Sequence, residues 1–415
     1  MSDNIYIIGV GMIKFGKYLE KGVKDLAGEA LELTLADCGI TRDQIQAAWF
    51  SNSSWGISSY QHCIRGQVAL SAHNLDKIPI VNVENACASG STALHSAWMA
   101  VKAGMYDCVL AMGAEKLYTE DRKKVMEGFI AGTDVEETRA FIDALKKQNA
   151  ERKAAEAAAG KGRPDKEKKG GHSVFMDFYA MGARWHMEKY GTTQKQLAVI
   201  AAKAHNNSAL NPLAQYTFPM TVEQVMADRE VAFPLTRAMC APIGDGAAGA
   251  IVCSERFLKQ HPGKRAVAIK SSVLLSGSRQ GISDISKRAS SQAYKTAGVS
   301  PQDIHVAEVH DATAYGELYQ SEQLGFCAEG EGGPFAESGA TEIGGKIPIN
   351  PSGGLMSRGH PIGASGLAQI YELVTQLRGE AGKRQVSDAR IALAENGGGT
   401  LGGGEAAMAV HIIQA

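Results

Sequence analysis

The sequence predicts an α/β protein made of two similar halves, and three observations support this prediction. Short β-rich runs alternate with helical patterns over the first part of the 415-residue chain. The same alternation resumes after residue 264. In each half an Ala-Ser-Gly triplet, at residues 88–90 and 364–366, leads into a helical pattern and then a strand pattern. Such alternation is typical of βα units, so we expect a largely parallel sheet.

The two halves contain matching sets of predicted elements. In the first half these are strands at Ile5–Val10, Ala47–Ser51, Pro79–Val83 and Cys108–Met112 and helices at Val23–Asp37 and Ser91–Ala103. In the second they are strands at Val267–Ser272, His305–Val309, Arg390–Glu395 and Glu405–Ile413 and helices at Ser290–Ala297 and Gly366–Leu377. Between the halves, helical periodicity covers Phe175–Tyr190 and Gln194–Ala209, and Arg237–Cys253 returns to an apolar strand.

Composition indicates an ordinary globular protein. Apolar residues make up 44% of the chain and charged residues 21%, with a formal net charge of −1. Nucleic acids and anionic membranes bind proteins through concentrated basic surface. A net charge this close to zero therefore gives no reason to expect binding to either of them. The first residues carry no basic, apolar leader, and no run is long enough to span a bilayer, so we expect a cytoplasmic protein.

The seven cysteines have no CxxC spacing, which argues against a disulfide framework or a zinc cluster.

The segment Glu120–Gly171 differs in composition from the rest of the chain and is rich in Lys, Arg, Glu and Ala. Within it, Glu151–Lys169 has almost no large apolar residue, which indicates a charged helical excursion with a mobile loop. The segment is either a solvated insertion or a surface whose basic residues meet ligand phosphates or a partner protein.

Cys87 is the first candidate for chemistry. It follows the strand-like Ile80–Val83 and precedes a helix of small residues, so its sulfur should lie near a helix N-terminus. Unpaired amide groups and the helix dipole stabilise a thiolate at such a position. A single cysteine is more often a core residue than a nucleophile, but this strand–turn–helix context favours a nucleophile.

Three further motifs accompany Cys87. His360 lies between glycine and proline in a constrained turn, where it acts in chemistry or only caps the turn. His310 ends a predicted strand, and ligand sites of α/β sheets collect at strand ends. Glycines at 397–399 and 402–404 predict a loop with exposed amide donors.

Together these motifs resemble the ordered motifs of the thiolase superfamily, especially sterol carrier protein type thiolases. The matching blocks are residues 85–90, 244–248, 310–312, 350–354, 359–363 and the closing glycine loop. The resemblance implies a thiolase fold, with duplicated halves in a five-layered αβαβα arrangement. It places the N-terminal half at 1–118 and 236–260, an inserted loop region with the charged segment at 119–235, and the C-terminal half at 261–415.

The resemblance also implies roles for individual residues. Cys87 matches the nucleophile that is acylated, His360 the histidine that takes its proton, and His310 an oxyanion-hole residue. An amide near Gly403 would complete a second oxyanion hole with the Cys87 amide. Asn396, Gly403 and Tyr315 are expected to contact the substrate or its oxyanion. The family needs no metal and no permanently bound cofactor, and coenzyme A is a substrate.

One departure affects the mechanism. Many thiolases carry a second cysteine as acid and base in the final glycine loop, and sterol carrier protein type enzymes can place it immediately after His-Asp. Here no cysteine follows Cys327, and Ala312 follows His-Asp. The proton donor to the carbanion is therefore His360 in a second role, Tyr315, or a water. Cys240 and Cys327 are interpreted as structural.

These features predict a thiolase that cleaves or forms a β-ketoacyl-CoA through an acyl-Cys87 intermediate. The missing cysteine and the insertion suggest an aromatic, branched or dicarboxylic acyl group, and the chain resembles subunits of the benzoylsuccinyl-CoA thiolase subtype. The alternatives are a thiolase-like retro-aldol lyase on β-hydroxyacyl-CoA and a non-catalytic thiolase-like subunit of a complex. The resemblance implies a homodimer and suggests a small zinc-ribbon/OB-fold partner protein.

Overall fold

A nine-stranded sheet forms the centre of the computed structural model, which describes residues 4–121, 125–126, 128–144, 147, 173–280 and 284–415. The strand order is β3-β2-β4-β7-β1-β8-β11-β10-β9. The first five are β1 (Ile5–Met12), β2 (Ala47–Ser51), β3 (Ile80–Val83), β4 (Cys108–Glu115) and β7 (Gly246–Ser254). The other four are β8 (Val267–Ser276), β9 (Val306–Glu308), β10 (Ile391–Leu401) and β11 (Gly404–Gln414).

The predicted strands are found within a few residues of their expected bounds, but the expectation of a largely parallel sheet is wrong. Strand β2 runs parallel to β3 and β4, and β10 runs parallel to β9. The five other pairings, which involve β1, β7, β8 and β11, are antiparallel. Strand β11 follows β10 directly through a tight turn, whereas residues 116–245 separate β7 from its neighbour β4 in the chain. Residue patterns report the period of a strand and not its direction.

The two halves repeat the same order of elements. The helices α1 (Val23–Cys38) and α4 (Ser89–Lys102) of the first half correspond to α11 (Ile285–Ala297) and α14 (Ser365–Leu377) of the second. Strands β1, β2, β4 and β7 likewise correspond to β8, β9, β10 and β11. Even the edge strand β3 has a counterpart, because Ile349 forms a parallel bridge to Ala307 of β9. The expected duplication is therefore present.

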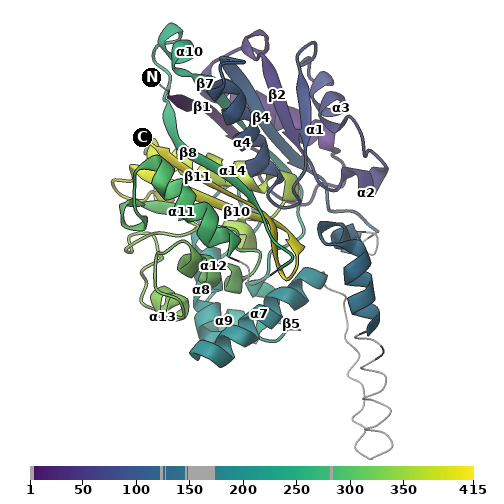
Figure 1. Ribbon diagram of the computed structural model, residues 1–415, viewed down its shortest axis with the longest axis vertical. Helices are drawn as coiled ribbons and strands as arrows, with labels where there is room; N and C mark the ends of the chain where they lie inside the picture. Colours follow the sequence, from purple (N-terminus) through teal and green to yellow (C-terminus); the bar gives the residue numbers. More distant parts are fainter. Residues whose placement is uncertain (1–3, 122–124, 127, 145–146, 148–172, 281–283) are drawn as a thin grey trace, which may run out of the picture.

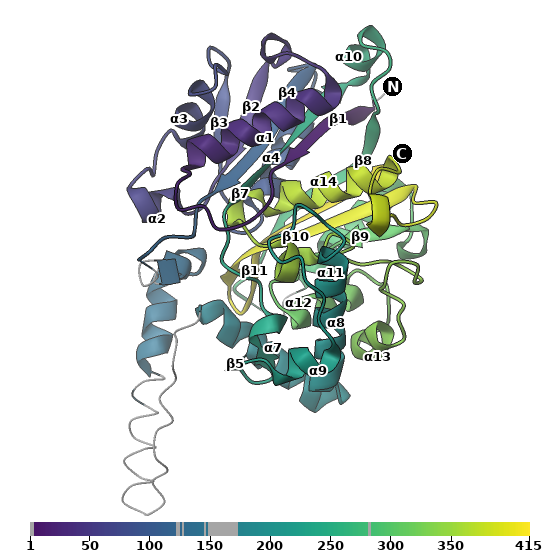
Figure 2. The same ribbon diagram turned by 180° about the vertical axis from the view of Figure 1, so that it is seen from behind.

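The elements stack in five layers, as the thiolase fold requires (Figures 1 and 2). Helices α1 and α3 (Arg65–Ser71) cover the first half of the sheet on one outside face. Helices α4 and α14 pack against each other between the two halves of the sheet. Helix α11 covers the other outside face, and α12 (Ala314–Gln323) lies beside α11.

Small residues of α4 explain why the central layer can hold two helices. Ala93, Ala97 and Ala100 let α4 come close to its neighbours, while Leu367, Ile370, Leu373 and Val374 of α14 fill the remaining space. Each buried Leu or Ile side chain contributes about 1.5–3 kcal/mol to the free energy of unfolding. Both helices begin at the Ala-Ser-Gly triplets, so the central layer aligns the two motif loops.

A helical lobe lies between β4 and β7 in the chain. Its helices α7 (Val174–Tyr190), α8 (Gln194–Ser208) and α9 (Val222–Ala227) pack with α12 around a separate apolar cluster. The short strands β5 (Glu230–Ala232) and β6 (Leu235–Thr236) pair beside it. The region 119–235 is therefore mainly helical where it is described, and the predicted charged loop Glu151–Lys169 lies outside the described residues.

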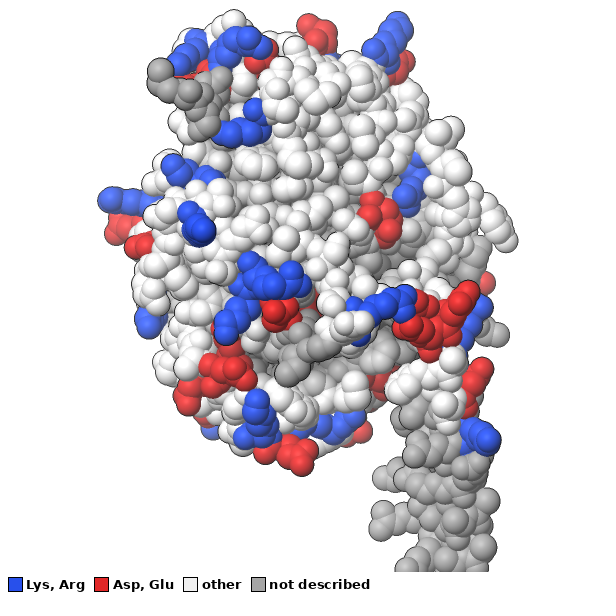
Figure 3. Space-filling view, viewed as in Figure 1, with Lys and Arg blue, Asp and Glu red and all other residues white. Residues whose placement is uncertain are grey.

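Further short helices are α2 (Trp55–Ser59), α10 (Glu255–Gln260) and α13 (Gly332–Glu337). Basic and acidic side chains are interspersed over the face seen in Figure 3, with a broad uncharged area between them. This face offers no concentrated basic surface of the kind that binds phosphate polymers. In the described part of the chain, no helix combines the length and apolar character needed to cross a membrane.

Candidate active site

Cys87 lies in a tight turn between β3 and α4, directly before the helix. Ala86 has a φ of 47°, a left-handed conformation that an alanine adopts only when its surroundings enforce it. The hydroxyl of Ser89 enforces it by accepting the Asn85 N–H at 2.9 Å and donating to the Ala86 carbonyl at 2.6 Å. The turn thus directs the Cys87 thiol away from the helix and into a cavity.

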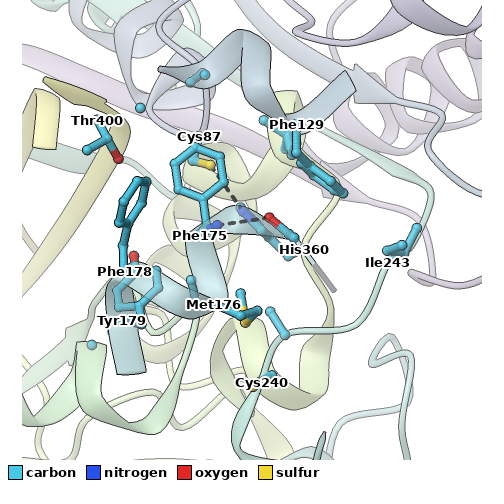
Figure 4. A pocket seen from close by; sticks show the side chains of 18 of the residues that line it. Cys87, Phe129, Phe175, Met176, Phe178, Tyr179, Cys240, Ile243, His360 and Thr400 are labelled. Carbon is cyan, nitrogen blue, oxygen red and sulfur yellow. Dashed lines mark hydrogen bonds between the residues drawn. The ribbon is translucent and has the colours of Figure 1, made fainter. Parts of the chain in front are cut away.

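His360 faces Cys87 from the second half of the chain, with Nε2 at 3.3 Å from Sγ (Figure 4). Its Nδ1 lies 2.7 Å from the hydroxyl of Ser365, and that hydroxyl donates its own proton to the Pro361 carbonyl at 3.0 Å. The hydroxyl must therefore accept from Nδ1–H, which leaves Nε2 with a lone pair. The arrangement makes His360 a base directed at the Cys87 thiol.

The role of Ser365 leads to a testable prediction. Replacing Ser365 with alanine removes the acceptor that fixes the His360 tautomer, so we expect kcat to fall about tenfold or more, with little change in KM. Steady-state kinetic measurements check this. Ser365→Thr keeps the hydroxyl and should recover most of the rate, whereas an unchanged kcat in Ser365→Ala would contradict the assigned tautomer.

His310 stands edge-on to His360, with ring centroids 5.3 Å apart. Asn396 accepts from the Ser91 hydroxyl at 3.0 Å, so its amide nitrogen is the group that faces His310 Nδ1 at 3.1 Å. An amide that donates to Nδ1 leaves the proton on Nε2, where His310 can donate to an oxyanion. Asn396 therefore acts through His310.

The side chains of Cys87, His310 and His360 place one potential metal ligand each within 4.8 Å of one another. A metal would need a lone pair from His310, but the Asn396 amide makes its free ring nitrogen a proton donor. The trio is better matched to a negatively polarised oxygen than to a cation.

The glycine-rich segment is not the loop that the sequence predicts. Strand β10 continues through Gly397 to Leu401, and a tight turn at Gly402 and Gly403 joins it to β11. A side chain at Gly398 would lie 2.2 Å from the Asn85 carbonyl oxygen, so only glycine lets this strand touch the Cys87 turn. The backbone amide of Gly399 lies close enough to the Cys87 sulfur to lower the pKa of the thiol. Gly403, near which the sequence analysis expects an oxyanion-hole amide, lies at the turn and lines the same cavity as Gly399.

Burial controls the protonation of the three residues. It raises the pKa of the Cys87 thiol to about 12, and the Gly399 amide only partly offsets this. Burial also lowers the pKa of His310 to about 4, and burial, His310 and Arg358 hold the pKa of His360 well below its usual range. The sequence suggested a thiolate stabilised by the helix, but the resting site holds a thiol and a neutral imidazole. A thiol in this state needs a base to take its proton when it attacks, and the His360 imidazole is within reach of it.

The raised pKa of Cys87 predicts its alkylation behaviour. The Cys87 thiol stays largely protonated until the pH approaches about 12. Its thiolate fraction therefore still increases in the pH range above the pKa of a free thiol, where a free thiol is already ionised. We expect the iodoacetamide labelling rate of Cys87, followed by peptide mass spectrometry, to increase throughout pH 8–11. N-acetylcysteine, as the control, should level off above its own pKa, and a plateau of Cys87 labelling below pH 8 would contradict the neutral resting pair.

An internal ion pair connects the two histidine segments. Arg358, two residues before His360, is fully buried, and its Nη1 lies 2.7 Å from Oε2 of Glu308, two residues before His310. Both groups also reach the hydroxyl of Ser352, at 3.0 and 2.8 Å. The pair therefore connects the two segments that carry His310 and His360.

A cavity of about 1550 Å³ opens over Cys87. Its wall around the thiol is apolar, formed by Leu117, Val125, Phe129, Ile243 and Ile362. Helix α7 adds the side chains of Phe175, Met176, Phe178 and Tyr179. The sequence showed α7 only as a helical pattern, and nothing in that pattern distinguishes a residue facing a cavity from one facing the core.

The remaining candidate residues fall into two groups. Tyr315, Cys240 and Gly403 line the cavity, and the Tyr315 ring packs against Gly182 and Tyr319. Cys327 is not among the cavity residues.

Comparison with protein families matches both halves of the chain. The family model described as "Thiolase, N-terminal domain" matches residues 5–256, and "Thiolase C-terminal domain-like" matches residues 271–411. An acetyl-CoA acetyltransferase of Methanothermobacter thermautotrophicus is 40% identical over 99% of both chains. Sterol carrier protein 2 of Bos taurus is 38% identical over 95% of this chain and 70% of its own length.

Solved structures show the same fold. The Ltp2-ChsH2(DUF35) aldolase matches with a TM-score of 0.76 at 24% identity and covers 99% of this chain and 98% of its own. Human mitochondrial 3-ketoacyl-CoA thiolase matches with a TM-score of 0.70 at 16% identity over 100% and 99% of the two chains. With the family models matching both halves, the chain belongs to the thiolase family of acyltransferases.

Proposed function

We propose that the protein catalyses reversible thiolysis of a β-ketoacyl-CoA through an acyl-Cys87 intermediate. The observation that carries this proposal is the 3.3 Å contact between Cys87 Sγ and a His360 Nε2 that Ser365 keeps unprotonated. A nucleophile paired with a base that a third group orients is the arrangement required for acyl transfer.

The proposed reaction balances without a metal or redox step. His360 takes the Cys87 proton as sulfur attacks the β-keto carbonyl, and the Cα–Cβ bond then breaks to leave an enolate on the thioester fragment. The Nε2–H of His310 stabilises the enolate oxygen. His360 returns its proton to the α-carbon, and the thiol of free CoA then displaces the acyl group from Cys87. The products are two acyl-CoA molecules.

Assigning this second proton transfer to His360 follows from the arrangement of the cavity. His360 receives a proton in the first step and stands edge-on to His310. The pKa of Tyr315 is raised by burial, which makes its phenol a weak acid. An amide donor to a developing oxyanion contributes about 2.7–4 kcal/mol in comparable acyl-transfer sites, which is the role we propose for the amides of Cys87 and Gly399.

The cavity wall favours a bulky apolar acyl group on Cys87. Phe129, Phe175 and Phe178 surround the thiol together with aliphatic side chains. An aromatic or branched acyl group would make favourable apolar contacts with such a wall, and the aromatic ketone of benzoylsuccinyl-CoA is one candidate.

Human mitochondrial 3-ketoacyl-CoA thiolase has been solved with CoA. We propose that CoA reaches Cys87 past Arg229 and Arg237, two cations that also line the cavity.

We also propose a homodimer formed through β3. This strand is at the edge of the sheet and presents a row of backbone groups to solvent, and Val81 on it is 42% exposed. Exposed apolar side chains of Tyr60, Ile64 and Met99 lie on neighbouring elements.

A second partner is suggested by Ltp2, which is solved with the DUF35 protein ChsH2. A protein of this zinc-ribbon/OB-fold kind is therefore the hetero-oligomer partner we propose.

Mass spectrometry of the purified chain tests the proposed function, with and without a DUF35-type partner. A panel of β-ketoacyl-CoAs should leave an acyl adduct on Cys87 that free CoA removes. No adduct, together with cleavage of β-hydroxyacyl-CoA, would establish the retro-aldol alternative instead. Absence of both reactions would leave a non-catalytic subunit.

A further inference from the structure

We propose that Gly132 and Phe175 determine substrate specificity by keeping the cavity wide directly beside the Cys87 thiol. The space that they leave accepts an acyl group that is branched, or carries a ring, at the carbon next to the carbonyl that Cys87 attacks. This selectivity rests on the proposed thiolysis and specifies its substrate class. It concerns one position of the acyl group, whereas the apolar wall described above concerns only its general character.

Gly132 brings the Phe175 ring to the turn of the nucleophile. It ends η2 (Phe129–Gly132), a short helix that lines the cavity. A Cβ atom at Gly132 would lie 3.0 Å from Cζ of Phe175 and 3.9 Å from Cβ of Ala86, the residue before Cys87. The end of the ring therefore packs where Gly132 has no side chain, next to the turn that carries the thiol (Figure 4).

The backbone does not require glycine at this position. Gly132 is not among the glycines with a left-handed φ, so other residues can adopt its conformation. Carbon atoms in contact normally lie about 3.5–4.0 Å apart. A Cβ atom 3.0 Å from Phe175 would therefore force either the ring or the η2 segment to move. The missing side chain makes room for the ring and does not serve a turn.

The η2 segment is held in place on the side away from the ring. Thr133, which follows η2, forms a parallel bridge to Thr400 of β10, and Arg279 forms an ion pair with Asp134. The ring itself lines the cavity, where Phe178 lies edge-on to it with ring centroids 6.4 Å apart. A side chain at position 132 would therefore push the ring into the space beside the thiol.

Two more glycines of the region 119–235 make room in the same way. A Cβ atom at Gly128 would lie 2.7 Å from Cγ2 of Ile57, and one at Gly182 would lie 2.7 Å from Cε1 of Tyr315. All four residues line the cavity, and neither glycine has a left-handed φ. Each glycine lets a large side chain pack into the cavity wall instead of into the cavity. Of these three glycines, Gly132 is the one that also contacts the turn of the nucleophile.

The position of this space determines which substrates benefit from it. Sulfur bonds to the β-keto carbon, so the next carbon of the acyl group is the first to meet the wall around the thiol. A linear acyl chain has a single CH₂ group there and leaves the width unused, while an isopropyl or phenyl group fills it. One additional methylene group in a fitted apolar pocket changes kcat/KM by about tenfold or more.

Isomeric substrates test this inference with the full chain. The compounds 4-methyl-3-oxopentanoyl-CoA and 3-oxohexanoyl-CoA contain the same atoms but are branched and linear, respectively, at the carbon in question. A third compound, 3-oxo-3-phenylpropanoyl-CoA, carries a ring there. In Gly132→Ala we expect the branched-to-linear ratio of kcat/KM to fall about tenfold from its value in the unmodified protein. The phenyl-to-linear ratio should fall further, and Gly132→Val should lower both ratios more than Gly132→Ala does.

A second substitution should reverse this loss. A leucine side chain has no atom at the place of Cζ, so Phe175→Leu in the Gly132→Ala protein should restore the branched-to-linear ratio to within about threefold of its original value. The matched control is Gly333→Ala, whose Cβ atom would lie 2.5 Å from Oε1 of Gln196, outside the cavity. This control should leave the ratio unchanged.

The possible results separate specificity from other roles. An unchanged ratio in Gly132→Ala would overturn the inference. So would an equal loss on linear and branched substrates that Phe175→Leu does not reverse, because it would assign the effect to the fold or to the neighbouring Gly399 amide.

Circular dichroism shows whether Gly132→Ala is folded. If it is not, Phe175→Trp decides, since it adds bulk to the ring and leaves Gly132 intact. It should lower the branched-to-linear ratio, and an unchanged ratio would overturn the inference. Absence of a Cys87 adduct with all three substrates in the unmodified protein would remove the proposed function itself, and the inference with it.

Discussion

Replacing Cys87 with alanine is expected to lower kcat for thiolysis by roughly 10⁴-fold or more, because no other described thiol faces His360. The fold should tolerate the change. The side chain is small, and the turn is fixed by Ser89 and Gly398 instead of by the sulfur. Circular dichroism and the denaturation midpoint should therefore stay close to those of the unmodified protein.

Cys240 provides the matched control for this experiment. It lines the same cavity, and burial raises its pKa to about 12 as well, but its Sγ donates to the Thr236 carbonyl at 3.3 Å. Cys240→Ala should retain kcat within a few-fold. A Cys87→Ala protein that keeps its rate, or a Cys240→Ala protein that loses it, would show that the wrong thiol has been assigned.

Replacing Arg358 with methionine is expected to lower the free energy of unfolding by about 3–5 kcal/mol, the cost of leaving a buried charge unpaired. Glu308 would remain, with a pKa already raised to about 7 by burial although Arg358 lowers it. Urea denaturation followed by circular dichroism measures the loss. Activity should fall too, since the pair fixes the spacing between His310 and His360.

Two comparisons give this prediction its specificity. Arg256→Met breaks the exposed pair with Asp107 and should cost less than about 1 kcal/mol. The double variant Arg358→Met with Glu308→Leu should regain part of the stability, since no unpaired charge is left. A cost for Arg358→Met as small as that for Arg256→Met would show that the pair does not hold the loops.

The sequence predicts the elements of this fold well and their directions less well. Strand β2 has the predicted bounds, and α1 and α14 differ from prediction by one residue each. Local patterns encode period and burial, which explains this agreement. Whether β7 pairs parallel or antiparallel with β4 depends on how the chain returns to the sheet, and residues 116–245 separate the two strands.

The candidate site also contains residues that the sequence identifies and residues that it does not. Cys87, His310 and His360 are each identified by a motif, and the structure places them together. Ser365 was visible only as part of a repeated triplet, and its contact with His360 depends on the turn at Pro361. The sequence did not single out Gly399, whose amide lies near the Cys87 sulfur, because the glycine run does not reveal where β10 ends. Tyr179 and Phe175 carry no local signal, since the cavity that they face is formed by distant segments.

The duplicated architecture divides the reacting groups between the two halves. The nucleophile begins α4 of the first half, while both histidines and Ser365 belong to the second. During synthesis, the thiol is therefore made more than 220 residues before the first of its partners, and a nascent chain holds Cys87 without its base. Separate fragments covering each half would be inert alone. Because α4 and α14 form one shared core layer, Cys87 and His360 come within reach of each other only when the two halves pack together.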